Sequence, residues 1–196
     1  MYETNIFSKD TNTKRLLNKD LILEIFEMLN SRLKDNSMYL EINIYNDTVM
    51  NLLYDIRPAT RDIDCIFCYE YSYTILNNIL SDIKYIYNLS DGWINNEVAE
   101  QLKYLKLQDM SSVLSYSNLK VNTPSVEQML AMKILSARAE PSNDFLDARL
   151  LCTTLGITTK DELLNVVSRF IKLSLIGERQ QQFIKYLGGD LGYDWE

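Results

Sequence analysis

The stretch YDIRPATRDIDCIF, residues 54–67, contains two aspartates separated by a single apolar residue. Side chains alternate across a β-strand, so we expect Asp62 and Asp64 on one face, while Ile63 and Cys65 point to the other. Two carboxylates held this close repel each other unless a cation lies between them, and hard oxygen ligands suit Mg²⁺ or Mn²⁺ better than zinc. The ordinary alternative is that the two acids form the solvated face of a sheet.

Basic residues precede the two acids. Arg57 and Arg61 flank a turn at Pro58, and an amphipathic segment, residues 47–55, leads into that turn. A strand, a short helix, a basic turn and an acidic strand together predict a compact pocket for an anion and its metal. The alternative for both arginines is an exposed position on a surface turn.

Composition limits the protein to ordinary globular classes. The 196 residues, 46% hydrophobic and 24% charged, fit one domain or a small domain with a helical extension. No segment has the apolar length of a membrane span and the first residues do not form a signal peptide, so we expect a cytoplasmic protein without a membrane partner. The net charge of −7 disfavours sequence-independent binding of nucleic acid, although it permits a local basic patch.

Three residue types exclude several kinds of site. Histidine is absent, which excludes Ser-His-Asp and Cys-His catalysis and His-containing zinc sites. Cys65 and Cys68 form a C-x-x-C without a second pair, and we interpret both as buried thiols. All six glycines follow residue 91, so the first half of the chain holds no glycine-rich phosphate loop.

Hydrophobic periodicity predicts an α/β core in residues 1–123 and a helical region in residues 124–196, packed on the core because no linker separates them. Residues 1–18 are expected to form a loose arm and Asn18 to cap the first helix, while residues 93–98 have no clear pattern. The predicted helices are 20–33, 48–54, 70–88, 126–139, 144–155, 160–173 and 177–187, the last ending before the two glycines 188 and 189 and a loose tail. The predicted strands are 38–45, the acidic strand after Arg61, 104–110 and 113–121.

Two motifs in this order resemble a known family. Residues 44–50 followed by 57–64 (IYNDTVM and RPATRDID) resemble the active-site segment of the nucleotidyltransferase superfamily, in particular AbiEii-type and related toxin-like bacterial proteins. Residues 124–133 (PSVEQMLAMK), followed by Arg138 and the segment 144–147 (DFLD), are similar to the family's lysine-bearing helix and its downstream Asp-x-x-Asp. The resemblance covers about residues 38–170, and it depends on the order and spacing of the two motifs.

The resemblance implies a mixed nucleotidyltransferase-type sheet flanked by helices and a helical C-terminal region. It also implies a Mg²⁺- or Mn²⁺-dependent transfer of a nucleotidyl group from a nucleoside triphosphate to an acceptor, which is tRNA or another RNA, or a protein. A cognate antitoxin is the partner expected for a toxin of this kind. The catalytic residues would be Asp62, Asp64 and Lys133, with the two aspartates as metal ligands, and the nucleotide would be bound by Asn46, Asp47, Arg57, Arg61 and Asp147. Asp109 is the candidate for a third carboxylate on a neighbouring strand.

One departure from the family pattern supports an alternative function. The family has paired glycines where this chain has Asn46 and Asp47, and a side chain there, especially an acidic one, would crowd and repel a triphosphate. The alternative is therefore a catalytically degenerate protein that keeps the fold as a binding module.

Several candidate residues also have structural interpretations. On helix grounds alone, Lys133 is an ordinary solvated lysine, and Asp144 and Asp147 orient Lys133 or Arg138 through a charged network. Tyr45 and Trp93 would stack on a base or, more ordinarily, be buried in the core.

Overall fold

The computed structural model describes residues 13–54, 56, 58–68, 72–106, 110–137 and 143–195. Predicted residues Arg57, Asp109 and Arg138 lie outside these ranges. The helices are α1 (Lys19–Asp35), α2 (Asn46–Tyr54), α3 (Tyr73–Tyr87), α4 (Val98–Leu102), α5 (Val126–Ser136), α6 (Asn143–Leu155), α7 (Lys160–Ser168) and α8 (Glu178–Asp190), with a 3₁₀ turn, η1 (Leu173–Leu175). The strands are β1 (Leu40–Ile44), β2 (Ile63–Phe67), β3 (Ile94–Asn95), β4 (Ser111–Ser115) and β5 (Leu119–Thr123).

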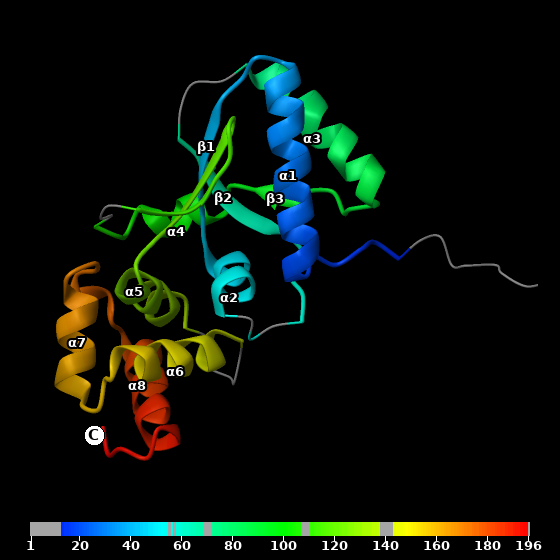
Figure 1. The fold of residues 1–196 in the computed structure, drawn as a ribbon. Helices are drawn as coiled ribbons and strands as arrows, with labels where there is room; N and C mark the ends of the chain where they lie inside the picture. Colours follow the sequence, from blue (N-terminus) through cyan, green and yellow to red (C-terminus); the bar gives the residue numbers. More distant parts are fainter. Residues whose placement is uncertain are drawn as a thin grey trace, which may run out of the picture.

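The strands form one mixed sheet in the order β3-β2-β1-β5-β4. The central strand β1 is antiparallel to β2 and parallel to β5. Helices α1 and α3 lie side by side against the sheet, whereas α5 to α8 gather beyond one end of its strands (Figure 1). An α/β fold with a mixed sheet, flanking helices and a C-terminal helical region confirms the predicted fold class.

Local sequence explains the first elements. In β1, Leu40, Ile42 and Ile44 are buried and alternate with half-buried residues, which confirms the predicted inward face. The side chain of Asn18 accepts a hydrogen bond from the backbone N–H of Leu21 at 2.9 Å and caps α1, as predicted.

Residues 13–18 of the N-terminal arm, the part that the structure describes, are not the loose segment that was predicted. Leu17 is 0% exposed, and its backbone N–H and C=O exchange two 2.8 Å hydrogen bonds with Thr60. The apolar side chain explains the docking, because a leucine that enters the core stabilises the segment that carries it. This contact fixes the turn that leads to Asp62.

The predicted strands after residue 103 are wrong in two respects. Residues 104–106 form a turn and the segment after it, not a strand, and residues 107–109 lie outside the described ranges. The predicted strand 113–121 contains a tight connection at residues 116–118 and therefore belongs to two antiparallel strands, β4 and β5. Ser117 and Asn118 are turn-forming residues, but the prediction followed the apolar residues on either side of them and therefore joined the two strands.

The C-terminal helices also end at different residues from those predicted. Helix α7 ends at Ser168, whereas α8 continues through Gly188 and Gly189 to Asp190. The residues beyond α8 are not loose, because the side chain of Trp195 is buried and its Nε1–H donates to the carbonyl of Thr158 at 3.0 Å.

Buried apolar side chains form a single cluster from Leu17 to Trp195 and include residues of both the sheet and the helical region. Cys65 and Cys152 are buried and Cys68 is half-buried, and all three thiols are free, which agrees with the expected buried thiols except at Cys68. Within the described ranges, no helix is long and apolar enough to span a membrane.

Candidate active site

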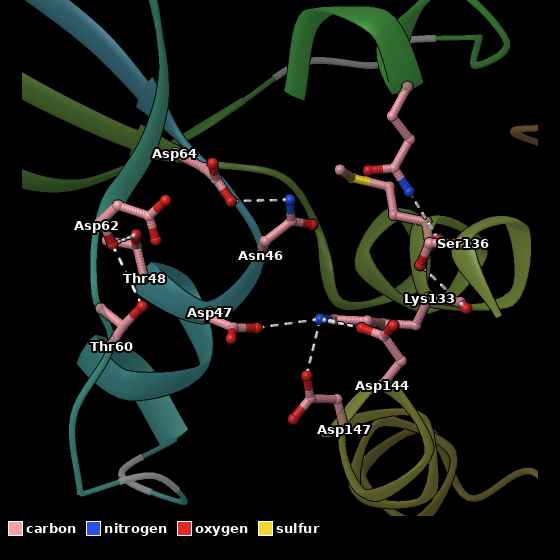
Figure 2. Close-up of polar contacts among 12 residues, drawn as sticks. Asn46, Asp47, Thr48, Thr60, Asp62, Asp64, Lys133, Ser136, Asp144 and Asp147 are labelled. Atoms are coloured by element: carbon pink, nitrogen blue, oxygen red, sulfur yellow. Dashed lines mark hydrogen bonds and ion pairs between the residues drawn. The ribbon is translucent and has the colours of Figure 1, made fainter. Parts of the chain in front are cut away.

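The turn from β1 into α2 brings Asn46 beside the acidic strand. Asn46 has a left-handed backbone, with φ of +50°, a conformation that asparagine tolerates better than most residues other than glycine. The backbone N–H of Tyr45 donates to the carbonyl of Asp64 at 3.0 Å, and the side-chain Nδ2 of Asn46 donates to Asp64 Oδ2 at 3.1 Å (Figure 2). The side chain of Asn46 therefore contacts Asp64, at a position where the family that the sequence resembles has a glycine.

Asp62 is held by its backbone as well as by its side chain. Its carbonyl oxygen accepts from the hydroxyls of Thr48 at 3.4 Å and Thr60 at 3.3 Å, while its Oδ2 accepts from Nδ2 of Asn95 in β3 at 3.0 Å. Figure 2 shows the carboxylates of Asp62 and Asp64 on the side of the acidic strand that faces the β1–α2 turn. Buried Ile63 lies between them in sequence and anchors the strand in the core.

The two carboxylates lie in an environment that disfavours their negative charges. Burial raises the pKa of Asp62 above its ordinary value, and the nearby charge of Asp47 raises it further, although the hydrogen bond from Asn95 opposes the change. Burial also raises the pKa of Asp64, with Asp62 and Asp47 adding to the effect and Asn46 opposing it. A divalent cation between the two side chains would relieve this repulsion.

The donor set fits an incomplete site for Mg²⁺ or Mn²⁺. Among the described residues, no group of three or more His, Cys, Asp or Glu side chains is arranged to hold a metal ion. Magnesium usually takes one or two carboxylates and completes its shell with water and substrate phosphates, so two aspartates suffice for the protein's share. The third predicted carboxylate, Asp109, lies outside the described ranges.

Lys133 is buried, so its interpretation as a solvated lysine is wrong. Its side chain is 3% exposed, and its Nζ lies 2.8 Å from Asp144 Oδ1, 2.8 Å from Asp147 Oδ2 and 3.4 Å from Asp47 Oδ1. Burial alone would lower the pKa of Lys133, but Asp147, Asp144 and Asp47 together raise it above its ordinary value. The lysine is therefore charged, and the predicted network with Asp144 and Asp147 is confirmed.

Two cavities meet at this network. The larger, of about 980 Å³, is lined by Asp62 and Arg61 together with apolar residues of α6, and the smaller, of about 390 Å³, is lined by Asp64 and Lys133. Asp47 lines both cavities, as does Asn143 of α6. The two acids of the acidic strand thus face adjoining spaces whose combined size suits a small-molecule ligand.

No protein-family model, curated protein or solved structure matches this chain.

The site therefore rests on its own geometry, which brings together most of the predicted residues. The described predicted residues that line one or both cavities are Asn46, Asp47, Arg61, Asp62, Asp64, Lys133 and Asp147. Tyr45 and Trp93 are buried in the core, which confirms the more ordinary of their two interpretations.

Asn95 was missed by sequence analysis, and the two threonines that bond to Asp62 lie within the motif segments 44–50 and 57–64 but received no role there. Asn95 belongs to a strand of two residues, too short for periodicity to reveal. A local signal was nevertheless present, because an Asn two residues before Glu97 can accept its backbone N–H, as Asn95 does at 2.9 Å.

Proposed function

We propose that this protein is a Mg²⁺- or Mn²⁺-dependent nucleotidyltransferase of the AbiEii-related type, which transfers a nucleotidyl group from a nucleoside triphosphate to an RNA or protein acceptor. The observation that carries the proposal is the convergence of Asp62 and Asp64 with the β1–α2 turn and a buried Lys133. These three parts come from distant segments of the chain, in the order that the resemblance implies.

Nucleotidyl transfer requires positioning and neutralisation of charge more than covalent help from the protein. The hydroxyl oxygen of the acceptor bonds to the α-phosphorus while its proton passes to water. The bond from the α-phosphorus to the bridging oxygen breaks, and its electron pair leaves with pyrophosphate. Asp62 and Asp64 would hold the cation, which neutralises phosphate charge and orients the reacting groups. Arg61 lines the larger cavity and Lys133, whose charge is paired with aspartates, lines the smaller cavity, so a cationic side chain lies at each cavity.

The direct test is transfer of label from each α-³²P-labelled nucleoside triphosphate to bulk tRNA or to a protein extract, with Mg²⁺ or Mn²⁺ present. We expect the wild-type protein to transfer label and the isosteric variants Asp62→Asn and Asp64→Asn to lose it. The matched control is Asp91→Asn, which removes an exposed aspartate paired with Lys84. Absence of transfer from all four nucleotides to either acceptor class would contradict the enzymatic proposal.

A catalytically degenerate binding module is the second candidate, and the contact between Asp47 and Lys133 favours it. Oδ1 of Asp47 lies 3.4 Å from Nζ of Lys133 and occupies the side of the ammonium group that a phosphate would contact. Asp144 and Asp147, at 2.8 Å, already balance the lysine's charge more closely. A phosphate must therefore displace Asp47, whose side chain is 37% exposed and can turn away.

This competition predicts that Asp47→Asn binds nucleotide more tightly than the wild type. A partly exposed ion pair contributes about 0.2–1 kcal/mol, so its removal should improve affinity by up to about fivefold. Calorimetry with a non-hydrolysable nucleoside triphosphate and Mg²⁺ measures the change. If transfer activity also appears in the variant, Asp47 restrains a competent enzyme, whereas weaker binding would show that Asp47 contributes to the cation site.

A further inference from the structure

We infer that Asn46 and Asn95 are positioning residues that each hold one of the two acidic-strand carboxylates in the orientation required by a divalent cation. This inference rests on the proposed function for the existence of the cation, but it gives Asn46 a role other than the nucleotide binding that the resemblance implies, and it gives a role to Asn95, to which the resemblance assigns none. Each asparagine donates one hydrogen bond from Nδ2 to Oδ2 of one aspartate, Asn46 to Asp64 and Asn95 to Asp62.

The sheet topology places one donor on each side of the acidic strand. Strand β2 lies between β3 and β1. Asn95 is the last residue of β3 and is the register partner of Asp64, whereas Asn46 is the first residue of α2, two positions after the end of β1. The two amides therefore approach β2 from opposite sides, and each aspartate accepts from an asparagine of its own.

The orientation of the Asn95 amide is itself fixed. Its Oδ1 accepts the backbone N–H of Glu97 at 2.9 Å, which identifies the other end of the amide as the NH₂ group. That NH₂ group donates to Asp62 at 3.0 Å and lies 3.4 Å from the carbonyl oxygen of Gly92. A side chain bonded at both ends restricts the rotation of the carboxylate that it contacts.

At Asn46 the backbone and the side chain impose separate requirements. The φ of +50° favours glycine or asparagine, and of these two residues only asparagine can also donate to Asp64. The amide of Asn46, which lines the smaller cavity, is thereby held against Asp64. These two requirements make Asn46→Gly a clean test, since glycine keeps the backbone conformation and removes the donor.

A neutral amide suits this role better than a lysine or an arginine would. It fixes one oxygen of the carboxylate without cancelling its charge, so the other oxygen remains available to a cation. Partners of this kind, which orient metal ligands from behind, typically contribute about 10-fold to 100-fold in metal affinity.

The experiment titrates Mn²⁺ into the full-length protein without nucleotide and measures its dissociation constant by calorimetry. We expect Asn46→Gly and Asn95→Ala each to weaken Mn²⁺ binding by about 10-fold or more. The control is Asn88→Gly, which replaces another left-handed asparagine, with φ of +53°, whose side chain bonds instead to Thr13 and Lys14. Urea midpoints of all variants show whether each remains folded under the titration conditions.

The outcomes separate this inference from the proposed function. If both folded variants bind Mn²⁺ as tightly as the wild type, or if Asn88→Gly weakens binding equally, the inference is wrong. If the variants lose affinity while the wild type transfers no nucleotide to any acceptor, the inference stands and the enzymatic proposal fails. Absence of Mn²⁺ binding by the wild type would overturn the inference, whereas the enzymatic proposal is decided by the transfer assay, in which substrate phosphates are present.

Discussion

Lys133 shows how strongly one residue depends on its surroundings. Its ammonium group is almost fully buried, yet Asp147 and Asp144 contact it at 2.8 Å and Asp47 lies at 3.4 Å, so its charge is more than balanced. Transfer of an unpaired charge from water into a protein is costly, and the carboxylate of Asp147, whose side chain is 0% exposed, depends on this lysine in turn. The network is therefore structural whether or not a phosphate ever binds to Lys133.

Replacement of Lys133 by methionine should lower the free energy of unfolding by about 3–5 kcal/mol, because it leaves buried carboxylates without their cation. Urea denaturation at neutral pH measures the loss. The control is Lys172→Met, which removes an exposed lysine and should change stability by less than about 0.5 kcal/mol. Equal losses in the two variants would show that the Lys133 network contributes nothing beyond an ordinary surface charge.

The raised pKa of Asp64 predicts the pH dependence of stability. Because the folded protein holds this proton more tightly than the unfolded chain, the group favours folding below its ordinary pKa, and that contribution is lost as the pH rises through the raised value. Asp64→Asn cannot ionise, so its stability advantage over the wild type should grow from about pH 3 to about pH 7. Urea midpoints across this range measure the difference. A difference that does not change with pH would mean that the carboxylate is no harder to ionise in the folded protein than in the unfolded chain.

Among the elements, those with a long and regular pattern were predictable. The alternating apolar residues Leu40, Ile42 and Ile44 located β1, and the Ser125 cap, which accepts from the backbone N–H of Gln128 at 3.2 Å, located the start of α5. The prediction that Lys133 is solvated was wrong because hydrophobic periodicity treats every lysine as solvent-facing, whereas residues 128–134 of α5 are buried on all sides. A helix surrounded by other elements has no solvent face from which its orientation can be inferred.

The site was predictable only where its residues belonged to a spaced motif. Asp62 and Asp64 stand out in the sequence because they are separated by one residue. Asn95 does not, since its role depends on the pairing of β3 with β2 across about thirty residues of chain. Partners contributed by a neighbouring strand become visible only when the register is known.

Helix α8 contains two adjacent glycines with opposite packing. A Cβ atom on Gly188 would lie 2.5 Å from Cγ of Trp195, whereas no heavy atom lies within 4 Å of a Cβ on Gly189. Gly188→Ala should therefore lose about 1–2 kcal/mol, since overpacking costs about 1–3 kcal/mol and helix propensity offsets part of it. Gly189→Ala should gain about 0.5–1 kcal/mol in the same helix. Urea unfolding of both variants measures the pair, and a gain in both would mean that Trp195 does not pack against Gly188 in solution.

For the whole molecule, the question is whether the sheet and the helices after residue 124 unfold as one unit. One buried apolar cluster includes residues of both parts, and the contact between Asp47 of α2 and Lys133 of α5 joins them at the site. The two cavities also draw their walls from both parts. A site built in this way keeps its geometry only if the two parts remain packed together.

Two buried thiols can show whether the sheet and the helical region unfold together, because Cys65 lies in β2 and Cys152 in α6. Burial raises the pKa of Cys152 to about 12 and also raises that of Cys65, so neither thiol supplies the reactive thiolate until its surroundings open. If the chain unfolds as one unit, both should become reactive at the same urea concentration, whereas half-buried Cys68 should react earlier and serve as an internal control. Pulses of N-ethylmaleimide at increasing urea, followed by peptide mass mapping, measure the three midpoints. Separate midpoints for Cys65 and Cys152 would show that the helical region and the sheet open independently, and the cavities between them would then be lost when the first of the two parts opens.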